Sequence, residues 1–357
     1  MKQRHILPIL LAALCLPLFS ATYAGDIFQI APGVANQAMG GTGLTNASSM
    51  AAGWWNPALL SQRDLRGAEL MYSEHFEGLL RQNQASIILG KWGYNLRYLG
   101  NEPIYVLDDN GDRVALLPDE DGVITTRQPS SLFSIIVNHL SINDIKLTQL
   151  EDPTDSLSND NRPEIWKTIG NNDVIVYGAI GRSLGTRTSL GIAPKLAYRS
   201  LAEHSGYAFG ADIGFLYMSR AFALGANLRD FFSSQVLWEN GTYENVLPNL
   251  DLEASYSILF GGVEKNKRVD IALRSQIFAD DRSEESSIEA GPFSADLHAG
   301  IRFYPTYSLA IMAGYDVDAI TAGLGINYQT LGLNYAFKAG SPDGLGSTQK
   351  ISLSYTW

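Results

Sequence analysis

The sequence predicts an all-β protein, a transmembrane antiparallel β-barrel of about 14 strands. Three observations predict it. An export signal begins the chain, no later stretch is long and apolar enough for a transmembrane helix, and apolar side chains alternate with small or polar ones along many segments. Only 18% of the residues are charged, below the share of about 25% in soluble domains. This low share, with 34 glycines and 17 tyrosines, is typical of a barrel wall.

The export signal occupies residues 1–24. Lys2 and Arg4 precede an apolar run, and small residues that suit a cleavage site follow it. Cys15, the only cysteine, lies inside this run. A lipoprotein cysteine would need a small residue before it, where Leu14 stands, so we interpret Cys15 as apolar filler of a signal peptide that is removed. The mature protein then has no thiol for a disulfide or a metal site.

The mature chain is strongly acidic. Without Lys2 and Arg4 it carries 24 basic and 37 acidic residues, a net charge of −13. This charge argues against nucleic acid as a partner, because it repels phosphates. No histidine has a second histidine at metal-ligand spacing, so we expect no metal, and we expect no cofactor.

The wall strands follow from alternation with a period of two. Along 207–217 the odd positions are apolar or aromatic, and the even positions are mostly small or polar. A soluble sandwich alternates too, but here Tyr and Phe recur at the first and last apolar positions, as in the aromatic girdles of a lipid-facing band. An even strand number places both termini on the periplasmic side. We expect strands near residues 68–77, 82–90, 92–106, 173–184, 187–200, 206–218, 220–232, 248–260, 267–279, 293–304, 306–316, 318–328, 329–338 and 348–357.

Two segments do not fit this wall, which otherwise occupies residues 67–357. Residues 25–66 are rich in Gly, Ala, Asn and Ser and show no period of two. Residues 101–172 are expected to form one long extracellular loop, although the apolar patch 132–140 could also be a strand or a loop helix that packs over the barrel mouth. The loop contains Asp108–Asp112, which lacks the ligand spacing of an EF-hand and favours a solvated turn over a calcium site.

The most specific motif lies in the segment that lacks alternation. It comprises Met39-Gly40-Gly41-Thr42-Gly43 and Asn56-Pro57-Ala58-Leu59-Leu60. The motif resembles the N-terminal signature of the PorV/PorQ family, within the FadL-like (outer membrane protein transport) superfamily of fourteen-stranded barrels. This resemblance extends loosely over the barrel, but the insertion at 101–172 departs from it. The resemblance implies that residues 25–66 fold into the barrel as a plug or hatch.

The physical properties of these residues suit such a plug. A barrel of about 14 strands encloses a lumen too wide for wall side chains to fill. Gly40, Gly41 and Gly43 allow close backbone approach and positive φ. Asn56 is held extended before Pro57, and its amide can fix a turn. The sequence is compatible with residues 25–66 acting either as a movable gate or as a static plug.

The C-terminal strand carries a second resemblance. Tyr355 and Trp357 end an alternating segment, which is similar to the signal that the barrel-assembly machinery recognises. An aromatic girdle would also explain these residues.

Charged residues that alternate inward carry both signs. In a porin they would set selectivity, whereas in a plugged barrel they would form ion-paired belts that hold the plug. His298 alternates inward among them; an outer-membrane phospholipase or deacylase would need such a histidine, but we favour a satisfied lumen histidine and expect no enzyme. The inward charges are Lys195, Arg199, Asp212, Arg229, Asp251, Glu253, Asp270, Arg274, Asp296 and Arg302.

Two functions follow from the family resemblance. The first is passage of hydrophobic small molecules across the outer membrane, as in FadL-like barrels. The second is an accessory role in type IX secretion, in which a PorV/PorQ-like barrel docks exported proteins. A general porin is a third choice, which a plug disfavours. The expected partners are outer-membrane lipid, the barrel-assembly machinery, and either a hydrophobic ligand or a secreted protein.

Overall fold

We analysed a computed structural model of the chain. The expected signal peptide and the stretch Asp108–Asp112 lie outside the residues it describes. Among the described residues, no helix is both long and apolar enough to cross a membrane. The structure describes residues 25–357 except 47, 62–65, 93–103, 108–112, 117–130, 186, 220, 261–266, 281, 283–285, 307 and 341–345.

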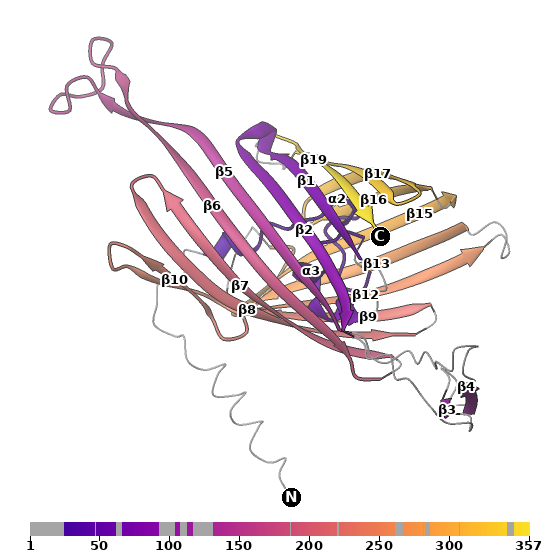
Figure 1. The fold of residues 1–357 in the computed structure, drawn as a ribbon. Helices are drawn as coiled ribbons and strands as arrows, with labels where there is room; N and C mark the ends of the chain where they lie inside the picture. The colour runs from indigo at the N-terminus through magenta and orange to yellow at the C-terminus, as the bar shows by residue number, and fades with distance from the viewer. Residues whose placement is uncertain are drawn as a thin grey trace, which may run out of the picture.

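The wall is one antiparallel sheet that closes on itself (Figure 1). β1 (Gly67–His75) pairs with β19 (Thr348–Thr356) on one side and with β2 (Leu80–Trp92) on the other. The closed, fourteen-stranded antiparallel barrel confirms the predicted fold class. The other wall strands are β5 (Ser131–Leu150), β6 (Pro163–Ser183), β7 (Thr188–Leu201), β8 (His204–Met218), β9 (Phe222–Arg229), β12 (Asn249–Phe260), β13 (Lys267–Phe278), β15 (Phe293–Thr306), β16 (Leu309–Asp316), β17 (Ala319–Tyr328) and β18 (Leu331–Lys338).

Three shorter strands extend this wall. β10 (Ser234–Trp238) continues β9 and pairs with the first half of β8. β11 (Tyr243–Val246) pairs with β10 and leads into β12, and β14 (Ile288–Ala290) forms a hairpin with β15. β9 and β10 are separated by a junction in which Asp230 and Ser233 have positive φ values of 52° and 60°.

The wall is apolar outside and polar inside. Leu273 points outward and is 63% exposed, whereas the next residue, Arg274, points inward and is 6% exposed. In β19, Leu353 is 53% exposed and Ser352 is 2% exposed. A soluble protein shows the reverse arrangement, because it buries its apolar face. An apolar outer surface on a closed sheet matches a barrel surrounded by hydrocarbon.

The two ends of the barrel differ. We call the end that holds the start of β1 and the last residues of β19 the terminal end, and the opposite one the far end. Because all wall strands are antiparallel, the β2–β5 connection lies at the terminal end and the β5–β6 connection at the far end. The parity argument predicts that the terminal end faces the periplasm, so we expect the far end to face the outside.

The prediction of one long loop over 101–172 is wrong. These residues contain β5 and the first part of β6, and β5 pairs directly with β2. β5 therefore takes the wall position that we assigned to 92–106. Its first half is apolar on both faces: Ile136 points inward and is buried, and Ile135 points outward. A strand that is buried on one side and lipid-facing on the other reads as a continuous apolar run and hides the period of two.

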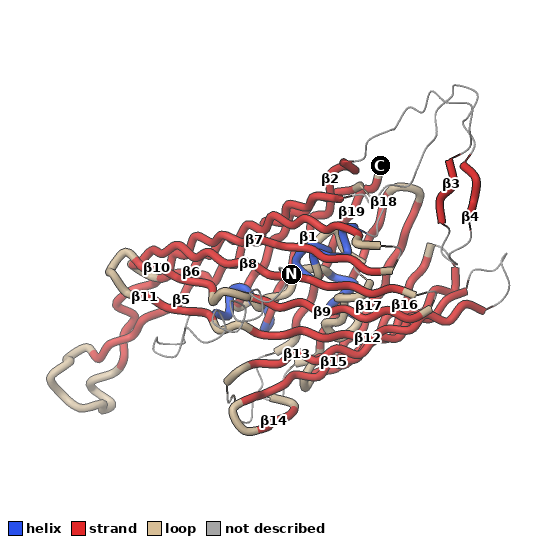
Figure 2. Tube along the Cα trace, turned by 90° about the horizontal axis from the view of Figure 1, so that it is seen from below, coloured by secondary structure: helices blue, strands red, loops and turns tan. Residues whose placement is uncertain are grey.

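The remaining parts of the expected loop lie at opposite ends. The hairpin of β3 (Ile104–Leu107) and β4 (Arg113–Leu116) belongs to the β2–β5 connection at the terminal end. Residues 151–162 connect β5 to β6 at the far end. Figures 1 and 2 show the two hairpins on opposite sides of the barrel.

Candidate functional site

The interior of the barrel is occupied by residues 27–61, which we call the luminal segment. Its short elements are η1 (Gly25–Phe28), α2 (Val34–Ala38), α3 (Ala52–Trp55) and η2 (Pro57–Ser61). α2 contacts β16, β17, β18 and β19, α3 contacts β5 and β6, and η2 contacts β5 to β8. The short helices therefore lie inside the ring of strands, as Figure 2 also shows.

Gly40 lies where the luminal segment approaches the wall most closely. Its φ is 67°, and a Cβ at this position would collide with the backbone oxygens of Ala299 and Tyr315. The facing wall residues are glycines as well, because a Cβ on Gly300 or Gly314 would collide with the backbone at Met39 or Gly40. Glycine on both sides of this contact allows two backbones to meet without side chains between them.

Glu253 of β12 holds the next turn of the luminal segment. Its Oε2 accepts hydrogen bonds from the N–H groups of Gly43 (2.6 Å) and Leu44 (3.0 Å). Its Oε1 accepts from the N–H (3.0 Å) and the hydroxyl (2.6 Å) of Thr45. The side chain is 4% exposed. One buried carboxylate thus satisfies three backbone donors that have no partner in a helix or strand.

Asn56 and Pro57 fix the other end of the segment. The Asn56 amide donates to the carbonyl oxygens of Leu44 and Phe215, both at 2.9 Å, and its Oδ1 accepts from the N–H of Ala58 at 3.0 Å. It therefore ties two parts of the luminal segment to β8. Pro57 packs where wall strand β7 has Gly191, at which a Cβ would collide with the Pro57 backbone.

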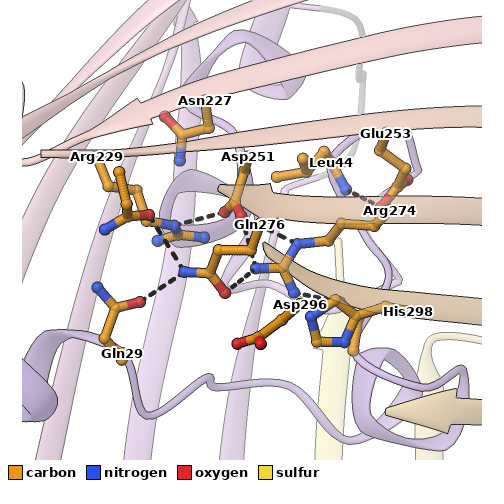
Figure 3. Close-up of polar contacts among 12 residues, drawn as sticks. Gln29, Leu44, Asn227, Arg229, Asp251, Glu253, Arg274, Gln276, Asp296 and His298 are labelled. Carbon is orange, nitrogen blue, oxygen red and sulfur yellow. Dashed lines mark hydrogen bonds and ion pairs between the residues drawn. The ribbon is translucent and has the colours of Figure 1, made fainter. Parts of the chain in front are cut away.

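The predicted inward charges form pairs that reach the luminal segment. Asp251 binds Arg229 at 2.6 Å and Arg274 at 2.8 Å, and all three side chains are buried (Figure 3). Arg274 also donates to the carbonyl oxygen of Gly41 at 2.7 Å, and Arg229 to that of Trp54 at 3.3 Å. The ion network therefore holds the segment by its backbone.

A second buried cluster lies beside this network. Lys195 binds Asp212 at 2.8 Å and Asp230 at 2.7 Å, and its ammonium group lies 4.6 Å from the ring centroid of Phe28. Asp230 was not among the predicted residues, because it lies in the β9–β10 junction, where no period of two assigns a face.

Other predicted charges bind outside these clusters. Arg199 binds Asp173 at 3.1 Å, and Arg302 binds Asp270 at 3.2 Å and donates to the Ser48 hydroxyl. Glu69 was also missed: its carboxylate accepts the Met50 N–H at 2.7 Å, although it lies in a strand whose alternation we recognised.

The luminal segment and the far end of the wall enclose a cavity of about 750 Å³, which we call the vestibule. Trp54 and Trp55 line it from the segment. Apolar and charged residues both line it, and the Arg282 guanidinium lies 4.1 Å from the ring centroid of Phe278. The apolar lining residues include Ile30, Phe76, Leu80, Val246, Leu247 and Phe278.

Several charged lining residues of the vestibule are paired with one another. Arg282 binds Asp296 at 2.8 Å, and Asp316 binds Lys338 at 2.8 Å. His298 Nδ1 lies 2.9 Å from Asp316 Oδ1 and 3.0 Å from the carbonyl oxygen of Gly40. His298 therefore helps to hold the glycine contact, and Asp316 is its nearest acidic partner.

The C-terminal aromatic residues lie outside the wall. Tyr355 and Trp357 are 48% and 54% exposed, and their ring centroids lie 5.9 Å apart. This position suits a girdle, and recognition by the assembly machinery stays a prediction.

The chain has a partial match to one family. The model of the type IX secretion system membrane protein PorP/SprF family matches residues 189–355, just under half of the chain. The match begins after the Gly40–Leu60 motif, so it does not test the resemblance of that motif to PorV/PorQ. No curated protein is significantly similar to this chain.

The chain is also similar in architecture to several solved structures. The toluene transporter TodX of P. putida is 12% identical, with 91% of this chain and 98% of that chain covered and a TM-score of 0.49. The toluene transporter TbuX of Ralstonia pickettii is 10% identical, with 91% and 97% covered and a TM-score of 0.48. A FadL homologue of Pseudomonas aeruginosa is 12% identical, with 92% and 98% covered and a TM-score of 0.40.

These findings agree on location and architecture. The outward face is apolar, the sheet is closed, and the matching family model describes a membrane protein. The chain is an outer-membrane β-barrel of fourteen wall strands.

Proposed function

We propose that the protein is a non-enzymatic accessory barrel that docks exported proteins in type IX secretion, and that the luminal segment closes its lumen. The observation that carries this proposal is the attachment of the segment to opposite sides of the wall. Glu253 binds it from β12, Arg274 from β13 and Asn227 from β9. On the opposite side, the Glu69 carboxylate of β1 accepts the N–H of Met50 at 2.7 Å.

A closed lumen favours docking over conduction. A segment held on several sides by buried hydrogen bonds costs several kcal/mol to displace. The vestibule above it ends on Trp54 and Trp55 and opens at the far end. Such a barrel presents a shaped surface to the outside. The partial match to the PorP/SprF family supports secretion as the process in which this surface acts.

Passage of hydrophobic molecules is a second candidate, which the apolar lining residues of the vestibule favour. Phe76, Leu80 and Phe278 are among these residues. The molecule would then have to pass the luminal segment, so this function requires the segment to move.

Gene deletion in the source bacterium distinguishes the two candidates. Docking predicts that deletion removes exported proteins from the cell surface and medium, while the uptake of a hydrophobic solute such as toluene stays unchanged. Normal secretion combined with reduced uptake would overturn the proposal. Planar-bilayer conductance of the purified protein is the second measurement, and we expect a closed wild-type barrel.

A further inference from the structure

Strands β5 and β6 extend far beyond their neighbours. β5 pairs with β2 only as far as Ser141, which lies opposite Arg81. β6 pairs with β7 only from Asn171, which lies opposite Leu201. Residues 142–170, which we call the outer ribbon, therefore pair only with each other. Nine residues of strand at about 3.3 Å each make a ribbon of about 30 Å, and Figure 1 shows it projecting from the far end.

A ribbon of this kind is incomplete as a structure. An isolated two-stranded hairpin is marginally stable in water, and unpaired strand edges are templates for another strand. The outer ribbon also exposes large apolar side chains: Leu157 is 70%, Trp166 56% and Ile165 55% exposed. These features point to a partner that adds a strand and covers apolar surface.

The two edges of the outer ribbon are not equally available. On β6, the Gly170 carbonyl oxygen accepts the N–H of Ala202, and Lys167 binds Glu203 of the same β7–β8 turn. Trp166 is an unpaired residue that forms a β-bulge in β6, and it further interrupts the hydrogen-bonding edge of this strand. On β5, residues Ile145–Leu150 pair with β6 without an inserted residue of their own, and no other strand of the described residues pairs with them. The available edge is Ile145–Leu150.

The charge of the outer ribbon restricts the partner. It contains six acidic and three basic residues, a net charge of −3. The ribbon repels anionic headgroups and a second copy of itself, and attracts a basic segment. The charged residues are Asp144, Lys146, Glu151, Asp152, Asp155, Asp160, Arg162, Glu164 and Lys167.

We propose that the outer ribbon binds an extended basic segment of an exported polypeptide, which adds as a third strand along Ile145–Leu150. This inference rests on the proposed function and names the docking site for it. Backbone hydrogen bonds along the edge would provide sequence-tolerant binding, and the acidic residues would select for positive charge.

The binding test uses the full mature barrel in nanodiscs. Because Cys15 lies in the expected signal peptide, Ser156→Cys provides a single labelling site at the ribbon tip. The probe is a ten-residue peptide of alternating Lys and Val, and the matched peptide carries Glu in place of Lys. We expect saturable binding of the Lys peptide only, with slowed amide exchange at 145–150. Equal binding of both peptides, or no binding, would overturn the proposal.

Two variants separate charge from edge pairing. Glu151→Gln, Asp160→Asn and Glu164→Gln together remove three acidic charges from side chains that make no hydrogen bond or ion pair with the described residues. We expect this variant to bind the Lys peptide about tenfold more weakly, with the difference lost at high salt. Replacing residues 143–169 by a short turn leaves the wall pairs intact, and we expect no binding. Unchanged peptide binding by this shortened barrel would refute the site. The proposal would also fail if the wild-type barrel formed concentration-dependent dimers and the shortened barrel did not.

Secretion assays distinguish this inference from the function on which it rests. If removal of the whole chain leaves secretion normal, the proposed function fails. If removal stops secretion but the shortened barrel restores it fully, only the ribbon proposal fails.

Discussion

The luminal segment meets two different surfaces inside one barrel. Toward β5–β8 it packs through apolar side chains, with Trp54 and Trp55 against Ile136 and Tyr177. Toward β9, β12 and β13 it is held by Glu253 and by the Asp251 ion network. Apolar packing is strong but non-directional, whereas buried charge-assisted hydrogen bonds fix a position. The β5–β8 side therefore contributes most of the binding free energy of the luminal segment, and the side of β9, β12 and β13 fixes its position along the wall.

The largest expected effect is on the apolar side. Trp55→Ala removes a fully buried side chain, and we expect a loss of about 3–5 kcal/mol in the docking of the luminal segment. The measurement is protease cleavage of residues 27–61 in a barrel that still shows heat-dependent gel migration. Because most of the Trp55 contact is apolar, we expect the loss to change little at high salt. If cleavage is as slow as in the wild type, packing against β5–β8 does not stabilise the docked luminal segment.

The next largest effect is on the polar side. Glu253→Ala leaves three buried backbone N–H groups without an acceptor, so we expect about 3 kcal/mol of destabilisation and bilayer conductance above that of the wild type. Glu253→Gln is the matched control, because its amide oxygen keeps part of the bonding. If alanine and glutamine variants conduct alike, the carboxylate does not set the register.

A smaller effect tests the glycine contact between the two surfaces. Gly40→Ala places a Cβ against backbone that cannot move aside, and we expect about 1–3 kcal/mol of destabilisation in the same protease assay. Gly78→Ala is the control, since Gly78 also has a positive φ, 92°, but no atom lies within 4 Å of the added Cβ. If Gly40→Ala and Gly78→Ala lose similar stability, the positive φ explains the effect and the contact with the wall does not.

The smallest effect lies outside the lumen, in the ribbon tip. Asp152 accepts hydrogen bonds from the N–H and the hydroxyl of Thr154, which lower the pKa of Asp152 below its ordinary value of 3.8. A lowered pKa means that this stabilisation is present above pH 3.8 and is lost as the pH falls through the lower value. We expect amide exchange at 151–162 to accelerate only in acid, and Asp152→Asn to remove that dependence. If amide exchange in Asp152→Asn still accelerates in acid, the acid dependence does not come from Asp152.

The wall was predictable where one face is apolar and the other polar. The alternation in 207–217 and 348–357 defined β8 and β19 because lipid and a polar lumen lie on opposite sides of these strands. β5 was assigned to a loop because its lumen side packs on the apolar half of the luminal segment. Its neighbour in the lumen is distant in sequence, so no local pattern reveals it.

The contacts of the site were predictable only in part. Glycine at 40, 41 and 43 indicated close backbone approach, and Glu253 and Arg274 were recognised as inward charges. Their partners were not, because pairing depends on the register between strands and on where the luminal segment crosses them. Asp316 shows this limit: it binds His298 and Lys338 from the end of β16, at a position where alternation stops.

The closure of the wall through β1 and β19 has a consequence for biogenesis. The first and last strands form the seam, and the luminal segment directly precedes the first of them. A chain exported from its N-terminus delivers this filling before any strand of the cylinder exists. Pairing of β19 with β1 then closes the barrel around a luminal segment that is already inside, so the segment does not have to enter a finished barrel.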